Sequence, residues 1–388
     1  MITKASPRAG KLIVQQTGPD GFSAFIPNPL PPKPPLKYND DINLLVEKAN
    51  RALGRLDGAT YMLPNPDLFL YMYVKKEAVL SSQIEGTQAS LADLLEYEGE
   101  HGNNYRIDDV KEISNYVNAM DYGLERLKEL PLSLRLIREI HAKLLQGTRG
   151  GHKAPGEFRT SQNWVGGTKP SNARFVPPPA QEVMSCMGAL EKFIYDNKDT
   201  TPPLIKAGLV HAQFETIHPF LDGNGRVGRL LITFMLCHNR VIEKPLLYLS
   251  LYFKQFRDEY YERLTAIRRD GDWEGWLKFY LQGIYDISTQ ATTAAKLIMD
   301  LQAEHRQMVN SLSKASPSAV KLLDLLYQQP IVSVAYVSKE LGFSSPAARK
   351  AINNLERLGI LREISGKKRN RLYLYYAYMS IIREGTEV

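Results

Sequence analysis

Apolar and polar residues alternate with helical periodicity along most of the chain. Between residues 41 and 56, apolar side chains recur every three or four positions, which predicts one buried face of an amphipathic helix. Similar patterns predict further helices over residues 66–84, 87–97, 108–127, 133–145, 181–197, 204–217, 276–287 and 290–312. Ser133 stands where a helix N-cap is expected. The periodicity therefore predicts a mainly α protein.

Two segments interrupt the helical pattern. Residues 1–38 are rich in proline and glycine, so we expect an extended, polyproline-like arm around the body, with a peptide ligand for an aromatic groove as the alternative. Residues 156–179 carry turn residues between two short strand-like pieces, 163–165 and 174–176. This arrangement predicts a β-hairpin, and a plain connecting loop is the alternative.

The chain changes character after a polar linker at residues 313–317. Helices are predicted over residues 319–327, 334–341 and 346–358, and strand pieces over residues 361–364 and 371–376. This order is typical of a winged helix-turn-helix domain. We therefore divide the chain into three parts: an N-terminal arm with the first helices (1–105), a helical core (106–312) and a winged domain (317–388).

Most of the positive charge lies in the winged domain. The chain has a net charge of +7, and residues 316–388 hold eleven Lys and Arg against six Asp and Glu. Arg349 and Lys350 fall on the predicted recognition helix, and residues 367–371 fall on the tip of the wing. Because such a surface can contact phosphates, duplex DNA is a predicted partner. Winged domains also serve as protein or dimer contacts, so a protein partner is the alternative.

Residues 218–229, HPFLDGNGRVGR, concentrate the candidate chemistry of the chain. Pro219 disfavours helical dihedrals at the residue before it, so the preceding helix should end at His218 and leave that side chain on a loop. Three residues of the following turn tolerate positive φ: Gly223, Asn224 and Gly225. Their amides can therefore curl around an anion. A helix is predicted from Arg226 onwards, and helix N-termini also favour anions, so the stretch predicts a phosphate site.

The charged residues of this stretch suit phosphoryl-type transfer, which depends on positioning and charge neutralisation. Asp222 can ligate Mg²⁺, while Arg226 and Arg229, three apart on one helical turn, can bind the non-transferred phosphates. His218 titrates near neutrality and suits a general base for the attacking hydroxyl. The alternative is a turn that caps a surface helix, with an unrelated histidine beside it.

The stretch is similar, position for position, to the motif of the Fic family, His-x-Phe-x-(Asp/Glu)-Gly-Asn-Gly-Arg-x-x-Arg. The resemblance implies a helical core with a β-hairpin flap that transfers AMP from ATP to a protein hydroxyl. It also implies a role for each matching residue: His218 as base, Asp222 as Mg²⁺ ligand, Gly223, Asn224 and Gly225 as phosphate cradle, Arg226 and Arg229 as phosphate clamps, and Phe220 as core anchor. Gly225 stands where the related Doc kinases carry lysine, which favours the nucleotidyl-transferring branch.

A second segment, Ser81 to Gly86, resembles the inhibitory Ser/Thr-x-x-x-Glu-Gly/Asn motif of Fic proteins. It precedes the catalytic motif, as in the subgroup with an N-terminal inhibitory helix. The resemblance implies that Glu85 pairs with Arg229 and so removes the clamp for the γ-phosphate of ATP. From its surroundings in the sequence alone, Glu85 would be a solvated surface acid.

The resemblance implies two further binding regions. Residues 163–177 would form the flap, which holds a target segment in extended form beside the base. Three tyrosines after the motif are candidates to wall an adenine pocket, with a packed core position as the alternative: Tyr252, Tyr260 and Tyr261.

The function that the resemblance implies is adenylylation of Ser, Thr or Tyr hydroxyls, on a target protein or on the chain itself. ATP would be the substrate and Mg²⁺ the cofactor. Two alternatives stay open: removal of AMP at the same site, with Glu85 orienting a water, and a transcription regulator whose core only senses nucleotide. His218 argues against the sensor, because a sensor has no need of a base. A homodimer is also expected.

Several other functional classes lack support in the sequence. The apolar run after the motif is too short to span a bilayer and the first residues form no apolar signal region, so we expect a cytoplasmic protein. Cys186 and Cys237 have no metal-ligand spacing and are expected to be buried thiols. His141 lies on an amphipathic stretch and is expected to be packed or at the surface. P-loop and His-Glu-x-x-His motifs are absent.

Overall fold

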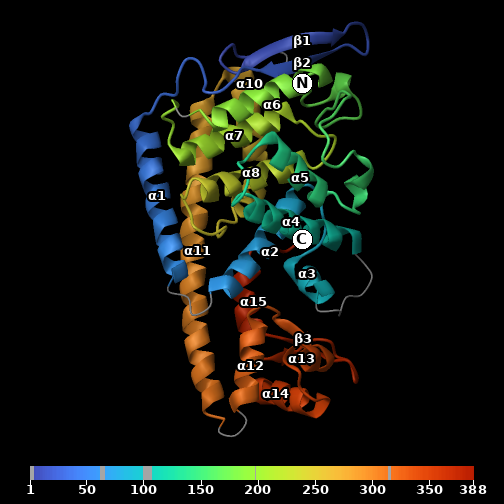
Figure 1. Ribbon diagram of the computed structural model, residues 1–388, viewed down its shortest axis with the longest axis vertical. Coiled ribbons are helices and arrows are strands. Elements are labelled where there is room, and N and C mark those ends of the chain that lie inside the picture. The colour runs from blue at the N-terminus through green and yellow to red at the C-terminus, as the bar shows by residue number, and fades with distance from the viewer. Residues whose placement is uncertain (1–3, 62–65, 99–106, 197, 313–315) are drawn as a thin grey trace.

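The computed structural model describes residues 4–61, 66–98, 107–196, 198–312 and 316–388. The fold is mainly α, as expected. One long helix, α11 (Trp273–Asn310), runs along a larger helical body and continues beside a smaller C-terminal domain (Figure 1). Its 38 residues span about 57 Å at 1.5 Å per residue. None of the helices in these described ranges is long and apolar enough to cross a membrane.

We expected separate helices at 276–287 and 290–312. This prediction is wrong, because α11 runs without a break from the first range into the second. The junction is polar in sequence, yet its side chains bond to their own helix. The hydroxyl of Thr289 donates to the carbonyl of Tyr285 at 2.8 Å, and that of Thr292 donates to the carbonyl of Ser288 at 2.7 Å. The polar residues therefore do not interrupt the helix.

The larger body consists of α11 and the helices that precede it: α1 (Asp40–Tyr61), α2 (Pro66–Ile84), α3 (Leu91–Glu98), α4 (Ile107–Arg126), α5 (Leu134–Leu144), α6 (Ala180–Ile194), α7 (Pro203–Ile217), α8 (Asn224–His238), α9 (Ser250–Gln255) and α10 (Arg257–Asp270). Residues 204–217 of α7 are all buried, so this helix forms the centre of the body. Helix α8 packs directly against it. The Phe220 ring, in the loop between them, is buried as expected.

Most helix boundaries agree with the sequence pattern to within a few residues. Ser133 caps α5, where its hydroxyl accepts the N–H of Leu136. Helix α3 begins at Leu91, four residues later than expected. The reason is a capping box in which the N–H and hydroxyl of Ser90 donate to Asp93 Oδ2 at 2.7 Å, and the N–H of Asp93 donates back to Ser90 Oγ at 3.2 Å.

The expected polyproline-like arm is in part a β-hairpin, so that expectation is wrong for residues 10–27. Strand β1 (Gly10–Gln16) pairs antiparallel with β2 (Phe22–Pro27). The N–H of Phe25 in β2 donates to the carbonyl of Val176 at 2.9 Å. The hairpin packs on the body through β2, where the successive residues Ala24 and Phe25 are both buried. The chain after Pro27 has no helix or strand up to α1.

The predicted hairpin at residues 163–176 is reduced to a single antiparallel bridge. The N–H of Val165 donates to the carbonyl of Phe175 at 2.8 Å, and the reverse bond is 3.1 Å long. A 3₁₀ turn, η3 (Pro170–Asn172), occupies the tip of the loop. The Asn172 side chain accepts the N–H groups of residues 168 and 169, so the backbone there turns and does not extend the ladder.

The C-terminal domain has the predicted winged-helix order, with two additional elements. It comprises α12 (Ser316–Leu326), β3 (Ile331–Ser333), α13 (Val334–Leu341), α14 (Ser345–Arg357), β4 (Arg362–Glu363), β5 (Leu372–Leu374) and α15 (Tyr376–Ile382). The strands form an antiparallel sheet in the order β3-β5-β4. Strand β3 and helix α15 are absent from the sequence prediction. The boundaries expected at 105/106 and within 313–317 fall at or beside residues outside the described ranges, and the three-part division stays a prediction.

The last residues of the chain return to the helical body. The side chain of Gln83, near the end of α2, donates to the carbonyl of Thr386 at 2.9 Å. The ammonium of Lys254 in α9 donates to the carbonyls of Gly385 and Glu387 at 3.0 and 2.8 Å. Thr386 is buried. The C-terminal domain is therefore attached to the helix that carries the expected inhibitory segment.

Candidate active site

His218 ends α7 in a left-handed backbone conformation, with φ 50° and ψ 60°. Its side chain is half-buried, and Nδ1 is enclosed without a hydrogen-bond partner in the part of the chain that the structure describes. Burial lowers the pKa of His218 to about 4, and the positive charges of Arg159 and Arg268 contribute to this shift. The imidazole is therefore neutral at pH 7, which is the state that a general base requires.

The turn after His218 leads into α8, which begins at Asn224, two residues earlier than expected. Gly223 adopts the left-handed conformation with φ 74°. The Asn224 side chain bonds twice to the backbone of Phe220: its oxygen accepts the N–H at 2.8 Å, and its amide donates to the carbonyl at 2.8 Å. Asn224 therefore holds the loop in shape, and the free amides at the start of α8 are available to an anion.

Gly225 is needed for space and not for an unusual backbone conformation, because it lies inside α8. A methyl group at this position would come within 2.1 Å of Glu85 Oε1 and 3.0 Å of Arg229 Nη1. Such distances are far shorter than van der Waals contact, so any larger residue would displace one of these groups. The glycine thus allows the end of α2 to approach the first turn of α8.

Arg226 has unused hydrogen-bonding capacity in this site. Its side chain is 6% exposed, and Nε and Nη1 are buried without a hydrogen-bond partner among the described residues. The carboxylates nearest to it in ion-pair range are Glu112 at 3.6 Å and Asp222 at 3.7 Å. A buried guanidinium with free donors is costly unless an anion satisfies them. This geometry fits an oxyanion such as a phosphate.

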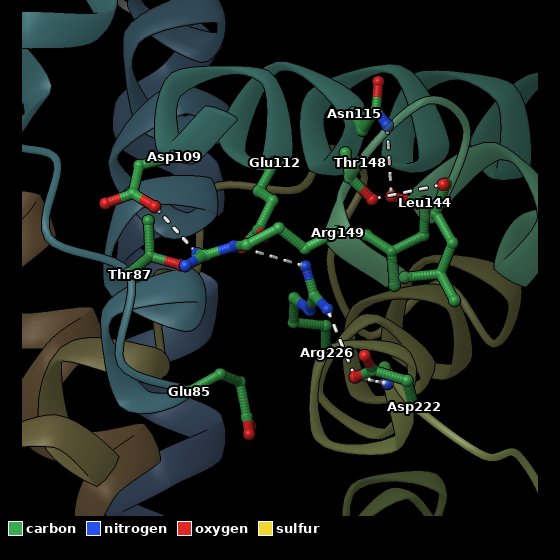
Figure 2. Close-up of polar contacts among 12 residues, drawn as sticks. Glu85, Thr87, Asp109, Glu112, Asn115, Leu144, Thr148, Arg149, Asp222 and Arg226 are labelled. Carbon is green, nitrogen blue, oxygen red and sulfur yellow. Dashed lines mark hydrogen bonds and ion pairs between the residues drawn. The ribbon is translucent and has the colours of Figure 1, made fainter. Parts of the chain in front are cut away.

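Glu112, on α4, links Arg226 to the segment that follows Glu85. Its carboxylate accepts the Nε–H of Arg149 at 2.9 Å and the hydroxyl of Thr87 at 3.0 Å. In Figure 2, Arg149 extends from its loop past Glu112 towards Asp109, and Arg226 lies below them with Asp222. Glu112 and Arg149 carry no signal in the sequence, because their contacts join residues that are far apart in the chain.

Arg229 is bound to both named residues of the expected inhibitory segment. Its guanidinium, 2% exposed, donates to Glu85 Oε1 at 2.7 Å, to Ser81 Oγ at 2.8 Å and to the carbonyl of Ser81 at 2.9 Å. Burial opposes ionisation of Glu85, but the charge and hydrogen bond of Arg229 outweigh it and lower the pKa of this carboxyl. Glu85 is therefore an ionised partner of the arginine and is only 36% exposed.

Asp222 is the exposed acid of the loop, with 44% of its side chain accessible. Its Oδ1 accepts the N–H of Gly223 at 2.6 Å. No group of three or more His, Cys, Asp and Glu side chains within the described ranges could hold a metal ion. Mg²⁺ commonly binds one or two carboxylates and completes its shell with water and substrate phosphates. A single carboxylate beside a phosphate site fits that mode.

His141, on α5, supports the loop and is fully buried. Its Nδ1 accepts the N–H of Gly156 at 2.8 Å, so Nε2 carries the proton and donates to the carbonyl of Asp222 at 3.0 Å. The ring stacks on Phe220 with centroids 3.7 Å apart. Burial lowers the pKa of His141 to about 4, which keeps this neutral tautomer at pH 7.

The three candidate adenine-wall tyrosines lie in different surroundings. Tyr252 is buried and packs against the rings of Phe256 and Phe279 at 4.7 and 5.0 Å. The hydroxyl of Tyr260 is also buried and bonds to His211 Nε2 at 2.9 Å. Tyr261 is partly exposed, and burial together with the charge of Glu85 raises the pKa of its hydroxyl. The charges of Glu85 and Arg229 thus act on the hydroxyl of Tyr261, while Tyr252 belongs to an aromatic cluster.

A family model described as "Fic/DOC family" matches residues 131–236, and one described as "Fic/DOC family N-terminal" matches residues 43–125. Residues 43–125 and 131–236 therefore hold the N-terminal and Fic domains of this family. In addition, residues 320–373 match a model described as an HTH DNA binding domain.

Individual proteins show the same relationship. The protein adenylyltransferase Fic of Drosophila yakuba is 32% identical over 178 residues, which are 45% of this chain and 32% of the relative. The match thus spans about a third of that relative's length. A solved Fic family protein from Desulfovibrio desulfuricans has a TM-score of 0.58 at 18% identity and covers 88% of this chain and 97% of its own. A Fic domain containing signaling protein from Bacteroides thetaiotaomicron has a TM-score of 0.50 at 20% identity, with 66% and 97% covered. These two structures show a shared fold.

Proposed function

We propose that the chain transfers AMP from ATP to a Ser, Thr or Tyr hydroxyl of a protein, including its own. The observation that carries this proposal is the combination, on one loop, of a neutral His218 and a buried Arg226 with unused donors. The relatives named protein adenylyltransferase support the same reaction class. Removal of AMP, with Glu85 orienting a water, is the alternative for the same residues.

In the proposed mechanism, His218 accepts the proton of the attacking hydroxyl. The hydroxyl oxygen forms a bond to the α-phosphorus, and the bond from the α-phosphorus to the bridging oxygen breaks, so pyrophosphate leaves with the electron pair. Arg226 and Arg229 neutralise the charge that develops on the leaving phosphates, and the amides at the start of α8 orient them. Asp222 would hold Mg²⁺, which supplies further charge neutralisation when it is bound.

Asp222→Ala is expected to remove the dependence of nucleotide binding on Mg²⁺. The variant loses the carboxylate, whereas the arginines remain to bind phosphates weakly. Calorimetric titration of ATP with and without Mg²⁺ measures how far nucleotide binding depends on the metal. The matched control is Asp199→Ala, at an acid that pairs with Lys206 outside the loop and should keep the full effect of the metal. An Asp222→Ala variant with unchanged metal dependence would remove this residue from the proposal.

Contacts of α2 and of the flap support two further roles: inhibition by Glu85 and binding of the target segment by residues 163–177. The bond between Glu85 and Arg229 occupies a guanidinium that the leaving phosphates need. Residues 163–177 adjoin the loop, since the Asn163 amide donates to the carbonyl of Phe220 at 3.0 Å. We assign this flap to the target segment whose hydroxyl is modified. A homodimer and a cytoplasmic location stay predictions.

The C-terminal domain is assigned to duplex DNA, with protein contact as the alternative. Exposed residues of the recognition helix α14 recur on one face: Pro346, Arg349, Lys350, Asn353 and Arg357. Every residue from Gly366 to Arg371 in the wing is exposed as well. Exposed basic residues on these two elements suit the major groove and the adjoining phosphates.

The full chain is expected to bind duplex DNA with a steep salt dependence. Replacing Arg349 and Lys350 by glutamine should reduce the slope of log K against log salt by about 2, since each phosphate contact contributes about 0.9. Gel shifts over a salt series measure the slope. Lys321→Gln, at an exposed lysine on α12, is the control and should change it little. If no binding occurs even at low salt, the domain is a protein-contact module.

A further inference from the structure

Arg159 is a buried arginine whose hydrogen bonds to other described residues all go to backbone carbonyls. Its side chain donates to the carbonyl of His218 at 2.9 Å, of Ser161 at 3.1 Å, of Pro178 at 2.5 Å and of Ile217 at 3.4 Å. Its own N–H donates to the carbonyl of Pro219 at 2.9 Å. The structure shows no carboxylate in ion-pair contact with it among the described residues. Burial lowers the pKa of this guanidinium to about 10.

Burying a cation without a counter-ion costs free energy. The carbonyl oxygens around Arg159 stabilise its charge in place of a counter-ion. Helix α7 ends at Ile217, and the left-handed turn at His218 leaves the last carbonyls without partners inside the helix. The C-terminus of a helix also carries partial negative charge. Arg159 therefore supplies both the missing donors and the complementary charge at the point where the chain bends into the catalytic loop.

The same side chain reaches the flap. Pro178 directly follows residues 163–177, where the flap ends. Its carbonyl accepts a hydrogen bond from the guanidinium nitrogen that also donates to the carbonyl of Ile217. The backbone on both sides of His218 and the end of the flap are thus bonded to one planar group. A planar fork with five N–H donors can hold several carbonyls in fixed directions, whereas an ammonium cannot.

We infer that Arg159 is the positioning residue of the proposed base, because it fixes the left-handed turn at His218 and the exit of the flap relative to each other. This inference rests on the proposed function, since the role of His218 as base comes from it. A target hydroxyl held by the flap would meet the imidazole only if the two segments keep their relative position.

The charge of Arg159 has a second consequence for His218. The groups that face the imidazole are Arg159 and Arg268, which lower its pKa, and Glu85 and the backbone of Glu215, which raise it. Arg159 contributes the largest effect after burial itself. Removing its charge should therefore raise the pKa of His218 from about 4 towards the ordinary value of 6.5.

The test uses the full chain with Glu85→Gly as the parent and compares Arg159→Lys with Arg159→Gln. Both variants should lower kcat for AMP transfer at least about tenfold, with KM for ATP within about twofold, because a lost charge-assisted bond is worth roughly this factor. Only Arg159→Gln should lose rate between pH 6.5 and 4, since Arg159→Lys keeps the charge. The control is Arg138→Gln, at a partly exposed arginine near Arg159. This variant should change neither kcat nor its pH dependence.

Chemical rescue separates positioning from a structural role. A cavity of about 450 Å³, lined in part by Arg159, Arg138 and Phe158, adjoins this side chain. Added guanidinium, at concentrations that do not denature the protein, should therefore restore part of the rate of Arg159→Ala, while methylammonium should not. A rate loss without rescue and without a shift of the pH profile would mean that Arg159 only stabilises the fold and would overturn the inference.

A readout without catalysis keeps this test separate from the proposed function. The imidazole of His218 can be titrated by NMR, with its signal assigned from His218→Ala. Its pKa should rise in Arg159→Gln and stay unchanged in Arg159→Lys and Arg138→Gln. If the Glu85→Gly parent transfers no AMP but this shift is seen, the proposed function fails and the control of His218 by Arg159 stands. If the parent is active and neither kcat nor the pKa moves, the inference fails.

Discussion

Glu85→Gly is expected to raise AMP transfer, including self-modification, by roughly tenfold to a hundredfold over the unmodified chain. Arg229 makes its charge-assisted bond to Glu85 at 2.7 Å, and a carboxylate held inside the protein competes at high effective concentration with the phosphates of ATP. Loss of one such bond, about 1.5–3 kcal/mol, corresponds to this change in the productive nucleotide pose. The rate of label transfer from ATP to protein measures it.

Two variants show whether the gain comes from release of the arginine. The double variant Glu85→Gly with Arg229→Ala should lose the gain, because the released partner is then missing. Gln88→Gly, at an exposed position three residues after Glu85 and before α3, should leave the rate unchanged. If Glu85→Gly is no more active than the unmodified chain, the acid does not inhibit. If the variant instead loses an AMP-removing activity, the alternative reaction is the correct one.

Removal of the His218 imidazole is expected to reduce AMP transfer by about a hundredfold to ten-thousandfold, which is the usual contribution of a general base. Two replacements are useful, because the residue has φ 50°. Asparagine tolerates this conformation better than alanine, so His218→Asn loses the base with less strain on the loop. ATP affinity should stay within about twofold in both variants.

The comparison is made in the Glu85→Gly background, where the rate is high enough to measure a large loss. His238→Ala, at an exposed histidine at the end of α8, is the matched control and should keep the full rate. Calorimetry gives the ATP affinity of each protein. Transfer that persists unchanged in His218→Asn would remove this residue from the mechanism.

Local features of the fold and of the site were predictable from the sequence because they depend on neighbouring residues. Pro219 determines where α7 ends, and the helical spacing of apolar residues determines most helices. The pairing of Glu85 with Arg229, 144 positions apart, followed only from the resemblance to a known motif. No property of the sequence around Glu85 distinguishes it from a solvated acid.

The features that could not be predicted from the sequence depend on contacts between distant segments. Arg159 bonds to carbonyls, which carry no side-chain signature, and His141 bonds to the carbonyl of Asp222, 81 positions away. The N-terminal hairpin was not predicted because residues 1–38 are rich in proline and glycine, a composition that favours an extended arm. Tyr252 has the same spacing as a pocket residue and as a core residue, and only its ring contacts separate the two.

We expect the loop from His218 to Arg229 to direct attack at the α-phosphorus of ATP. This is tested by incubating the Glu85→Gly protein and Mg²⁺ with ATP labelled either at the α- or at the γ-phosphate, and following label bound covalently to protein. Attack at the α-phosphorus incorporates the α-label and releases the γ-label as pyrophosphate. Incorporation of the γ-label would instead indicate a kinase, and the absence of both incorporation and pyrophosphate would exclude attack at the α-phosphorus.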